Sequence, residues 1–92
     1  MKPVDYNKLT ATEKSHIREE YAIHQKNLCW FCHGDLDMGV PPDVKEKSID
    51  WDLFPRGFMK NPIHLQHDHE TGMTEGAVHA YCNAVLWQYL GR

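Results

Sequence analysis

The sequence lacks any long apolar run. Its 92 residues contain no stretch of about 20 apolar residues, the length that a membrane-spanning helix needs. The polar segment that begins at Met1 also lacks the apolar core of a secretory signal peptide. We therefore expect a protein of the cytoplasm that has no membrane partner.

Basic residues are few and scattered. Lysine and arginine number 10 against 13 aspartate and glutamate residues, and the formal net charge is −3. Proteins that bind DNA tightly without regard to its sequence usually present a broad basic face. The composition argues against such a face, but it leaves open an enzyme that handles nucleic acid at one local site.

Cysteine is also scarce, and the three cysteines cannot pair evenly into disulfides. Two residues separate Cys29 from Cys32, and His79 and Cys82 repeat this spacing far downstream. Two such pairs are typical of one tetrahedral zinc ion that is held from two distant turns of the chain. We predict a structural Zn²⁺ site of the Cys₃His type, formed by these four residues.

The predicted zinc site matters because the chain is short. A domain of 92 residues has room for one core, and a core of this size contributes only about 3–5 kcal/mol net to stability. Structural zinc contributes roughly 10–16 kcal/mol in small zinc-binding peptides. We therefore predict that the metal decides whether the domain folds.

The order of elements predicts a single α+β domain over residues 1–92. Its expected segments are an N-terminal arm and helix over 1–27, a first zinc knuckle over 28–34, an irregular insertion over 35–62, and a β-hairpin and helix with the second knuckle over 63–92. Residues 1–9 are expected to be held loosely.

The N-terminal helix is predicted over residues 11–26. Thr10 and Glu13 have the spacing of a capping box, in which each side chain bonds the backbone of the other residue. The charged residues along this helix, among them Lys14 and Arg18, are expected to lie in water as a solvated face.

The insertion over 35–62 is rich in proline and has no sustained period, so only a short turn of helix is expected near residues 42–47. Its apolar residues are expected to fold back onto the core, with a partner surface as the alternative. They are Ile49, Trp51, Leu53, Phe54 and Phe58.

The C-terminal segment predicts strands over 63–67 and 73–78 around a Thr71-Gly72 turn. A helix over 80–90 follows, and Gly91 is its natural stop. The residues expected on the buried side of this helix are Val85, Leu86, Trp87, Tyr89 and Leu90.

This segment also carries a distinctive order of residues. Gln66-His67-Asp68-His69 precedes Thr71-Gly72, and the pair His79 and Cys82 is followed at once by Asn83. The order resembles the recombination endonuclease VII branch of the HNH nucleases, whose hallmark is Asp-His-x-His-x-Thr-Gly, then a glycine, then Cys-x-x-Cys-Asn. The resemblance covers about residues 28–34 and 63–90. It implies a zinc-stapled ββα-metal (His-Me finger) fold that holds one catalytic divalent ion, and a DNA endonuclease activity.

The resemblance implies a role for each matched residue. His67 falls on the general base, and a neutral imidazole can accept a proton from water at physiological pH. His69 falls on the second histidine, which supports the site or the scissile phosphate. Asn83 and Gln66 fall on the ligands of the catalytic ion, expected to be Mg²⁺ or Mn²⁺. Many members are phage-encoded, so the cytoplasm would be that of a host cell, and some are homodimers, for which the helix over 11–26 is a candidate interface.

The sequence departs from the family pattern at three positions. His79 replaces a zinc-binding cysteine, which a Cys₃His site accommodates. Gln66 stands where the family has a metal-binding Asp or His, and its neutral amide oxygen is a weaker ligand for a hard cation than a carboxylate. Glu75 stands where a basic residue is frequent. The Gln66 departure implies low metal affinity or compensation by a neighbour such as Asp68 or His64. It also leaves open a second interpretation, a catalytically weakened domain that binds DNA or protein as an accessory factor.

A third interpretation concerns the segment Cys29-Trp30-Phe31-Cys32-His33. It also satisfies the Cys-x-x-Cys-His signature of covalent c-type haem attachment. Such an electron carrier would use His33 and a methionine as axial ligands. Neither the third cysteine nor the histidine-rich hairpin has a task in that interpretation.

Overall fold

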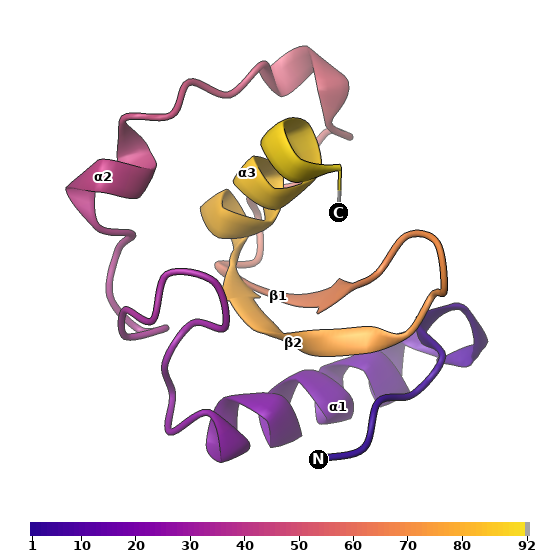
Figure 1. Cartoon of the computed structure of the whole chain (residues 1–92). Helices are drawn as coiled ribbons and strands as arrows, with labels where there is room; N and C mark the ends of the chain where they lie inside the picture. Colours follow the sequence, from indigo (N-terminus) through magenta and orange to yellow (C-terminus); the bar gives the residue numbers. More distant parts are fainter. Residues whose placement is uncertain (92) are drawn as a thin grey trace.

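A computed structural model of the protein describes residues 1–91 and shows a small α+β domain (Figure 1). Its helices are α1 (Ala11–His24), α2 (Pro42–Lys45) and α3 (Ala80–Leu90), and its strands are β1 (Ile63–His67) and β2 (Thr74–His79). Single turns of 3₁₀ helix lie at Tyr6–Lys8 and Trp51–Leu53. The two strands form an antiparallel hairpin, with α1 on one side and α3 on the other (Figure 1). The predicted class, α+β with a hairpin followed by a helix, is confirmed.

Helix α1 begins at the capping box that the sequence predicts. The Glu13 amide donates to Thr10 Oγ1 (3.1 Å), and the Thr10 amide donates to Glu13 Oε1 (2.9 Å). The helix ends at His24, two residues before the predicted end. Lys26 and Asn27 have positive φ angles (56° and 60°), which a right-handed helix cannot contain.

The N-terminal arm is held against the hairpin, so the prediction of a loose arm over residues 1–9 is wrong. The Val4 amide donates to Thr74 Oγ1 (2.9 Å), and the Thr74 amide donates to Val4 O (2.8 Å). The Tyr6 amide donates to Gly72 O (2.8 Å). A two-stranded sheet has free edges whose backbone groups need partners, and an extended segment supplies them. This pairing brings Tyr6 to the hairpin.

The hairpin contains one irregularity. Its strands pair regularly as far as Gln66, whose partner is Gly76. The next pair joins His67 to Thr74, so Glu75 is an extra residue on β2. Such a bulge bends the strand and changes the direction of nearby side chains. It lies beside the histidines that the sequence singles out.

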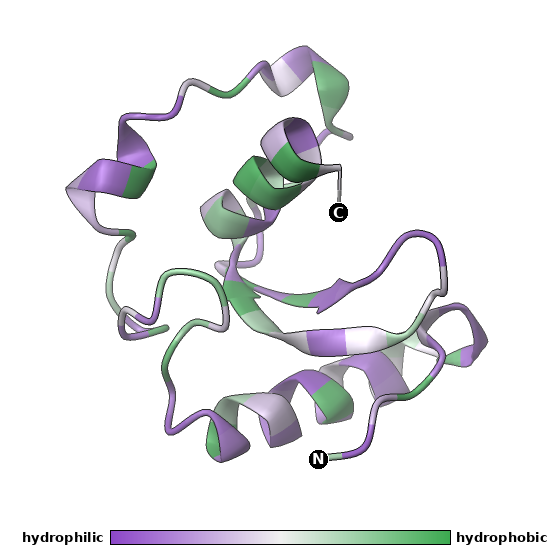
Figure 2. Cartoon of the chain, viewed as in Figure 1, coloured by the Kyte–Doolittle hydropathy of each residue, from purple (hydrophilic) through white to green (hydrophobic). Residues whose placement is uncertain are grey.

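Helix α3 follows β2 directly, and the positive φ of Gly91 (69°) ends it as predicted. Figure 2 shows that it is largely apolar. Val85 and Leu86 are buried, as predicted. The other expected core residues of this helix are exposed: Trp87, Tyr89 and Leu90. A short helix packed on a small hairpin buries only its near face. No helix within residues 1–91 is long and apolar enough to cross a membrane.

The insertion over 35–62 passes around α3 (Figure 1). Ile49 packs against the core and all three aromatic residues fold back as predicted, with the Trp51 ring centroid 5.9 Å from that of Tyr81, whereas Leu53 stays exposed. The Phe54 ring centroid lies 5.5 Å from that of Trp87, and the Phe58 ring centroid lies 4.7 Å from that of His64. The insertion thereby forms an aromatic wall between α3 and the start of β1.

Candidate functional site

Four metal-binding side chains converge where β2 passes into α3. One ligand atom from each of Cys29, Cys32, His79 and Cys82 lies within 4.8 Å of every other. His79 Nδ1 is 3.4 Å from Cys32 Sγ and 3.7 Å from Cys82 Sγ. A tetrahedral zinc ion with bonds of about 2.0–2.3 Å separates its ligands by about 3.5–3.8 Å. The cluster therefore fits the structural Zn²⁺ ion that the spacing predicts.

Backbone groups orient two of these ligands. His79 Nε2 donates to Asp35 O (2.8 Å) and Met38 O (3.0 Å). The ring nitrogen that donates carries the hydrogen, so Nδ1 keeps the lone pair that a metal needs. The Gly34 amide donates to Cys32 Sγ (3.4 Å) and stabilises negative charge on that sulfur.

The three thiols of the cluster differ in pKa. A hydrogen bond from Cys82 lowers the pKa of Cys29 to about 4, so Cys29 is a thiolate at neutral pH. The same hydrogen bond, together with burial, raises the pKa of Cys82. Burial raises the pKa of Cys32 as well. A zinc ion binds thiolates and releases the remaining protons, so it suits a cluster that already holds one negative charge.

The position of the sulfurs also bears on haem attachment. Covalent attachment would require Cys29 and Cys32 to bond a porphyrin outside the cluster. Cys29 is 1 % exposed, and Cys32 Sγ faces His79. The geometry favours zinc over haem.

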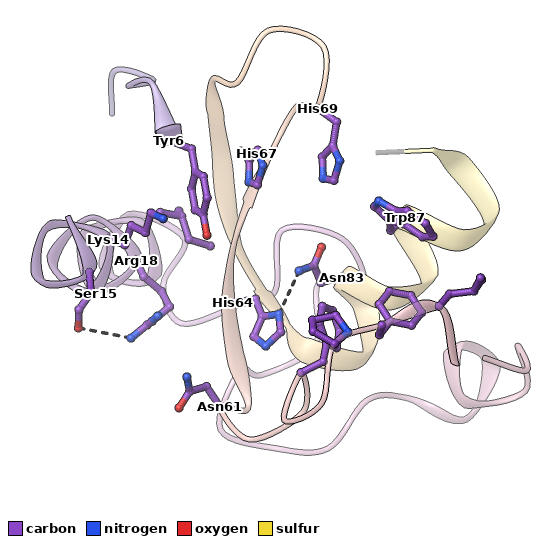
Figure 3. A pocket seen from close by; sticks show the side chains of 16 residues that line it. Tyr6, Lys14, Ser15, Arg18, Asn61, His64, His67, His69, Asn83 and Trp87 are labelled. Carbon is purple, nitrogen blue, oxygen red and sulfur yellow. Dashed lines mark hydrogen bonds between the residues drawn. The ribbon is translucent and has the colours of Figure 1, made fainter. Parts of the chain in front are cut away.

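A cavity of about 640 Å³ opens between α1, β1, α3 and the end of the insertion (Figure 3). Its polar lining comes from the arm, α1, the insertion, the hairpin and α3: Tyr6, Lys14, Ser15, Arg18, Asn61, His64, His67, His69 and Asn83. The structure therefore brings together three residues that the resemblance singles out, namely His67, His69 and Asn83.

His67 lies in a stack of rings (Figure 3). Its ring centroid is 3.9 Å from that of Tyr6 and 4.8 Å from that of His69, with interplanar angles of 10° and 8°. Because rings cover both faces of the imidazole, its nitrogen-bearing edge is the part that can meet a substrate. Burial, followed by the charge of His69, lowers the pKa of His67, so the ring is neutral at physiological pH.

Asn83 is held by His64. Asn83 Nδ2 lies 3.0 Å from His64 Nδ1. Figure 3 shows the amide oxygen on the other side, directed toward the part of the cavity that holds His67 and His69. Burial lowers the pKa of His64, so a neutral Nδ1 is available to accept the amide hydrogen. Asn83 therefore presents a carbonyl oxygen to the cavity.

Gln66 is the predicted site residue that the structure does not bring to the cavity. Its side chain is 1 % exposed, and Nε2 donates to His67 O (2.9 Å) and to Glu75 Oε1 (3.3 Å). The irregularity of the hairpin falls between these two residues, and Gln66 turns to Glu75 whereas His67 lines the cavity. Gln66 and Glu75, which both depart from the family pattern, are thus hydrogen-bonded to each other.

Lys14 and Arg18 line the cavity, although the sequence placed them on a solvated face. Lys14 Nζ lies 4.0 Å from the centroid of the Tyr6 ring, and the Arg18 guanidinium turns to Ser15 of the same helix (Figure 3). After burial, the charge of Lys14 contributes to the lowered pKa of His67, and the charge of Arg18 to that of His64. No aspartate or glutamate is among the described residues that line the cavity. The i, i+4 spacing shows that the two cations share one face of the helix, but the spacing does not show which part of the protein that face contacts.

Taken together, the residues that line the cavity favour the binding of a negatively charged group.

Comparisons with known proteins do not assign this arrangement. No profile of a protein family, no curated protein and no solved structure matches the chain. The function has to be inferred from the geometry of the zinc cluster and the cavity.

Proposed function

We propose that this protein is a metal-dependent DNA endonuclease of the HNH type, similar to the recombination endonuclease VII branch. The observation that carries the proposal is the chemistry of the cavity. It combines a neutral imidazole, a directed amide oxygen and two cations, with no carboxylate among the described lining residues. Cleavage of a phosphodiester needs a base to activate water and positive charge to stabilise the phosphate oxygens.

The two cations of α1 would contact the phosphate backbone. Ammonium and guanidinium groups bind phosphate oxygens through strong charge-assisted hydrogen bonds. Arg18 Nη2 is 3.3 Å from Ser15 Oγ, a contact that keeps the guanidinium on this wall of the cavity. The whole chain has a net charge of −3, so binding of DNA has to depend on local positive charge of this kind.

His67 acts as the general base. A water molecule at the nitrogen edge of the ring loses a proton to the imidazole while its oxygen attacks phosphorus. The bond between phosphorus and the 3′ oxygen breaks, and the 3′ oxygen takes up a proton from solvent. The products are a 5′-phosphate end and a 3′-hydroxyl end. Tyr6 and His69 stack on the ring and keep its edge directed into the cavity.

Asn83 is suited to supply one of the oxygen ligands of a divalent ion. Mg²⁺ prefers oxygen ligands, keeps several waters and takes further ligands from the phosphates of its substrate. Asn83 Oδ1 offers such an oxygen, whereas Gln66 bonds Glu75 and neither of these two lines the cavity. When bound, the ion supplies positive charge that stabilises the phosphate and the leaving oxygen. With one protein oxygen, its affinity is expected to be low until DNA is present.

A second candidate function is an accessory domain that binds nucleic acid without cutting it. The observation that favours it is the lack of a carboxylate ligand among the described residues that line the cavity. In such a domain Lys14 and Arg18 would still bind phosphate, while His67 would be a structural member of the ring stack.

A cleavage assay separates the two candidates. Zinc-loaded protein is incubated with supercoiled plasmid and with branched DNA, with and without added Mg²⁺ or Mn²⁺. The endonuclease proposal predicts cutting that requires the added ion and is lost in His67→Ala. His16→Ala, which changes an exposed histidine of α1, serves as the matched control. DNA binding without cutting under every condition would reject the endonuclease and favour the accessory domain.

A further inference from the structure

His64 has no part in the reaction described above, yet it is closely held. Its ring packs edge-on against Phe58, with 4.7 Å between centroids and an angle of 78°. The backbone of Phe58 and of Asn61 also acts on the pKa of the ring, and its Nδ1 lies 3.0 Å from Asn83 Nδ2. A side chain with partners on several sides has one orientation, which makes it suited to orient another residue.

These contacts set the direction of the hydrogen bond to Asn83. A neutral imidazole has one donor and one acceptor nitrogen. An amide NH₂ group can only donate, so the 3.0 Å contact with Asn83 Nδ2 makes His64 Nδ1 the acceptor and places the ring hydrogen on Nε2. An amide that donates through its nitrogen turns its oxygen to the opposite side, which here is the cavity (Figure 3).

We propose that His64 is a positioning residue that holds the Asn83 amide with its oxygen toward the divalent ion and the scissile phosphate. The inference rests on the proposed function and adds a residue to it. The orientation matters because the amide oxygen attracts a cation and the amide NH₂ group repels it. Partners that orient a metal ligand in this way are worth about 10–100-fold in metal affinity.

Two substitutions isolate the hydrogen bond. His64→Leu removes the acceptor. His64→Asn keeps an oxygen acceptor near the place of Nδ1 on a side chain of similar size. Both lose the ring contact with Phe58, so the difference between them reports the acceptor rather than the packing. His16→Leu is the control for loss of an exposed histidine.

The first measurement is nuclear magnetic resonance on the zinc-loaded full chain. The wild-type protein is expected to show a ¹⁵N–¹⁵N coupling across the hydrogen bond between Asn83 Nδ2 and His64 Nδ1. Mn²⁺ is then titrated, and broadening of the Asn83 side-chain amide signal reports binding. The Mn²⁺ concentration for half-broadening should rise about tenfold or more in His64→Leu and less than about threefold in His64→Asn. At limiting Mn²⁺ the rate of DNA cleavage should be lower in His64→Leu than in His64→Asn. At saturating Mn²⁺ the two rates should become equal.

The outcomes separate this inference from the proposed function. A missing coupling in the wild type, or equal Mn²⁺ requirements in the two variants, would overturn the role of His64. Cleavage of DNA with no Mn²⁺ effect at Asn83 would also overturn it, while leaving the endonuclease standing. Coupling and Mn²⁺ broadening with the expected order, but without cleavage of any DNA, would support His64 and reject the endonuclease.

Discussion

The zinc cluster and the histidine cavity differ in how far the chain closes them. In the cluster, four ligand atoms lie within 4.8 Å of one another, and backbone groups occupy the far side of His79. In the cavity, the side chains leave a volume of about 640 Å³ between them. A structural metal site is closed by protein ligands, whereas a site that handles a substrate keeps positions open. One region therefore suits a structural metal ion, and the other suits chemistry on a substrate.

The two regions nevertheless share one turn of helix. Cys82 belongs to the zinc cluster, and the next residue, Asn83, lines the cavity. Neighbouring residues of a helix point in directions about 100° apart, because one turn takes 3.6 residues. A zinc ion in the cluster would hold the start of α3 and thereby also determine where Asn83 lies. Substitutions in one region at a time test whether the two regions have these separate roles.

The largest expected effect is on the closed region. Cys82→Ser should abolish zinc binding and unfold the domain, because structural zinc is worth roughly 10 kcal/mol or more and the core alone about 3–5 kcal/mol. Zinc content by elemental analysis and thermal unfolding by circular dichroism check this. His33→Asn, in the same knuckle but outside the cluster, is the control and keeps a residue that tolerates the positive φ of 63°. An unchanged melting curve in Cys82→Ser would show that zinc does not hold the fold.

The next effect should fall on the open region alone. His67→Ala should reduce cleavage by about 10²–10⁴-fold, the usual loss when a general base is removed. Zinc content and the melting temperature should change little, because His67 lies outside the cluster. His16→Ala should retain wild-type cleavage. Full activity of His67→Ala would remove His67 from the mechanism.

A smaller effect is expected at Gln66, which the resemblance assigns to the catalytic ion. Gln66→Asp should lower the free energy of unfolding by about 1–3 kcal/mol, because a buried carboxylate would meet Glu75 and leave His67 O without its donor. Urea unfolding in the presence of zinc measures the change. Gln66→Asp combined with Glu75→Gln should recover part of the stability. Increased cleavage with unchanged stability would instead place residue 66 at the ion.

The smallest effects should come from the cations. Lys14→Gln and Arg18→Gln should each reduce the slope of log affinity against log salt by about 1, the value for one lost phosphate contact. Fluorescence anisotropy with duplex DNA between about 50 and 200 mM salt, without a divalent ion, measures the slope. Lys45→Gln is the control, because Lys45 is exposed and does not line the cavity. Equal slopes in all three variants would leave the cavity without a phosphate-binding role.

Sequence reasoning predicted the Cys₃His cluster, the hairpin, α3 and the capping box at Thr10. It failed for the arm, because pairing with the free edge of β2 joins Val4 to Thr74, which are 70 positions apart. It also placed Trp87 in the core, because helical spacing shows which residues share a face but not how much of that face a small hairpin can cover. It did not predict the contact between His64 and Asn83, since the two residues lie 19 positions apart.

The sequence by itself determined the features that depend on near neighbours. The spacing within each zinc pair, the cap of α1 and the glycine stop of α3 follow from residues a few positions apart, whose geometry the backbone restricts. Only the tertiary structure decided that Gln66 turns to Glu75, that α1 brings Lys14 and Arg18 to the lining of the cavity, and that His64 holds Asn83. Those contacts depend on the direction of each side chain across the packed elements, and a linear pattern of residue types does not contain that direction.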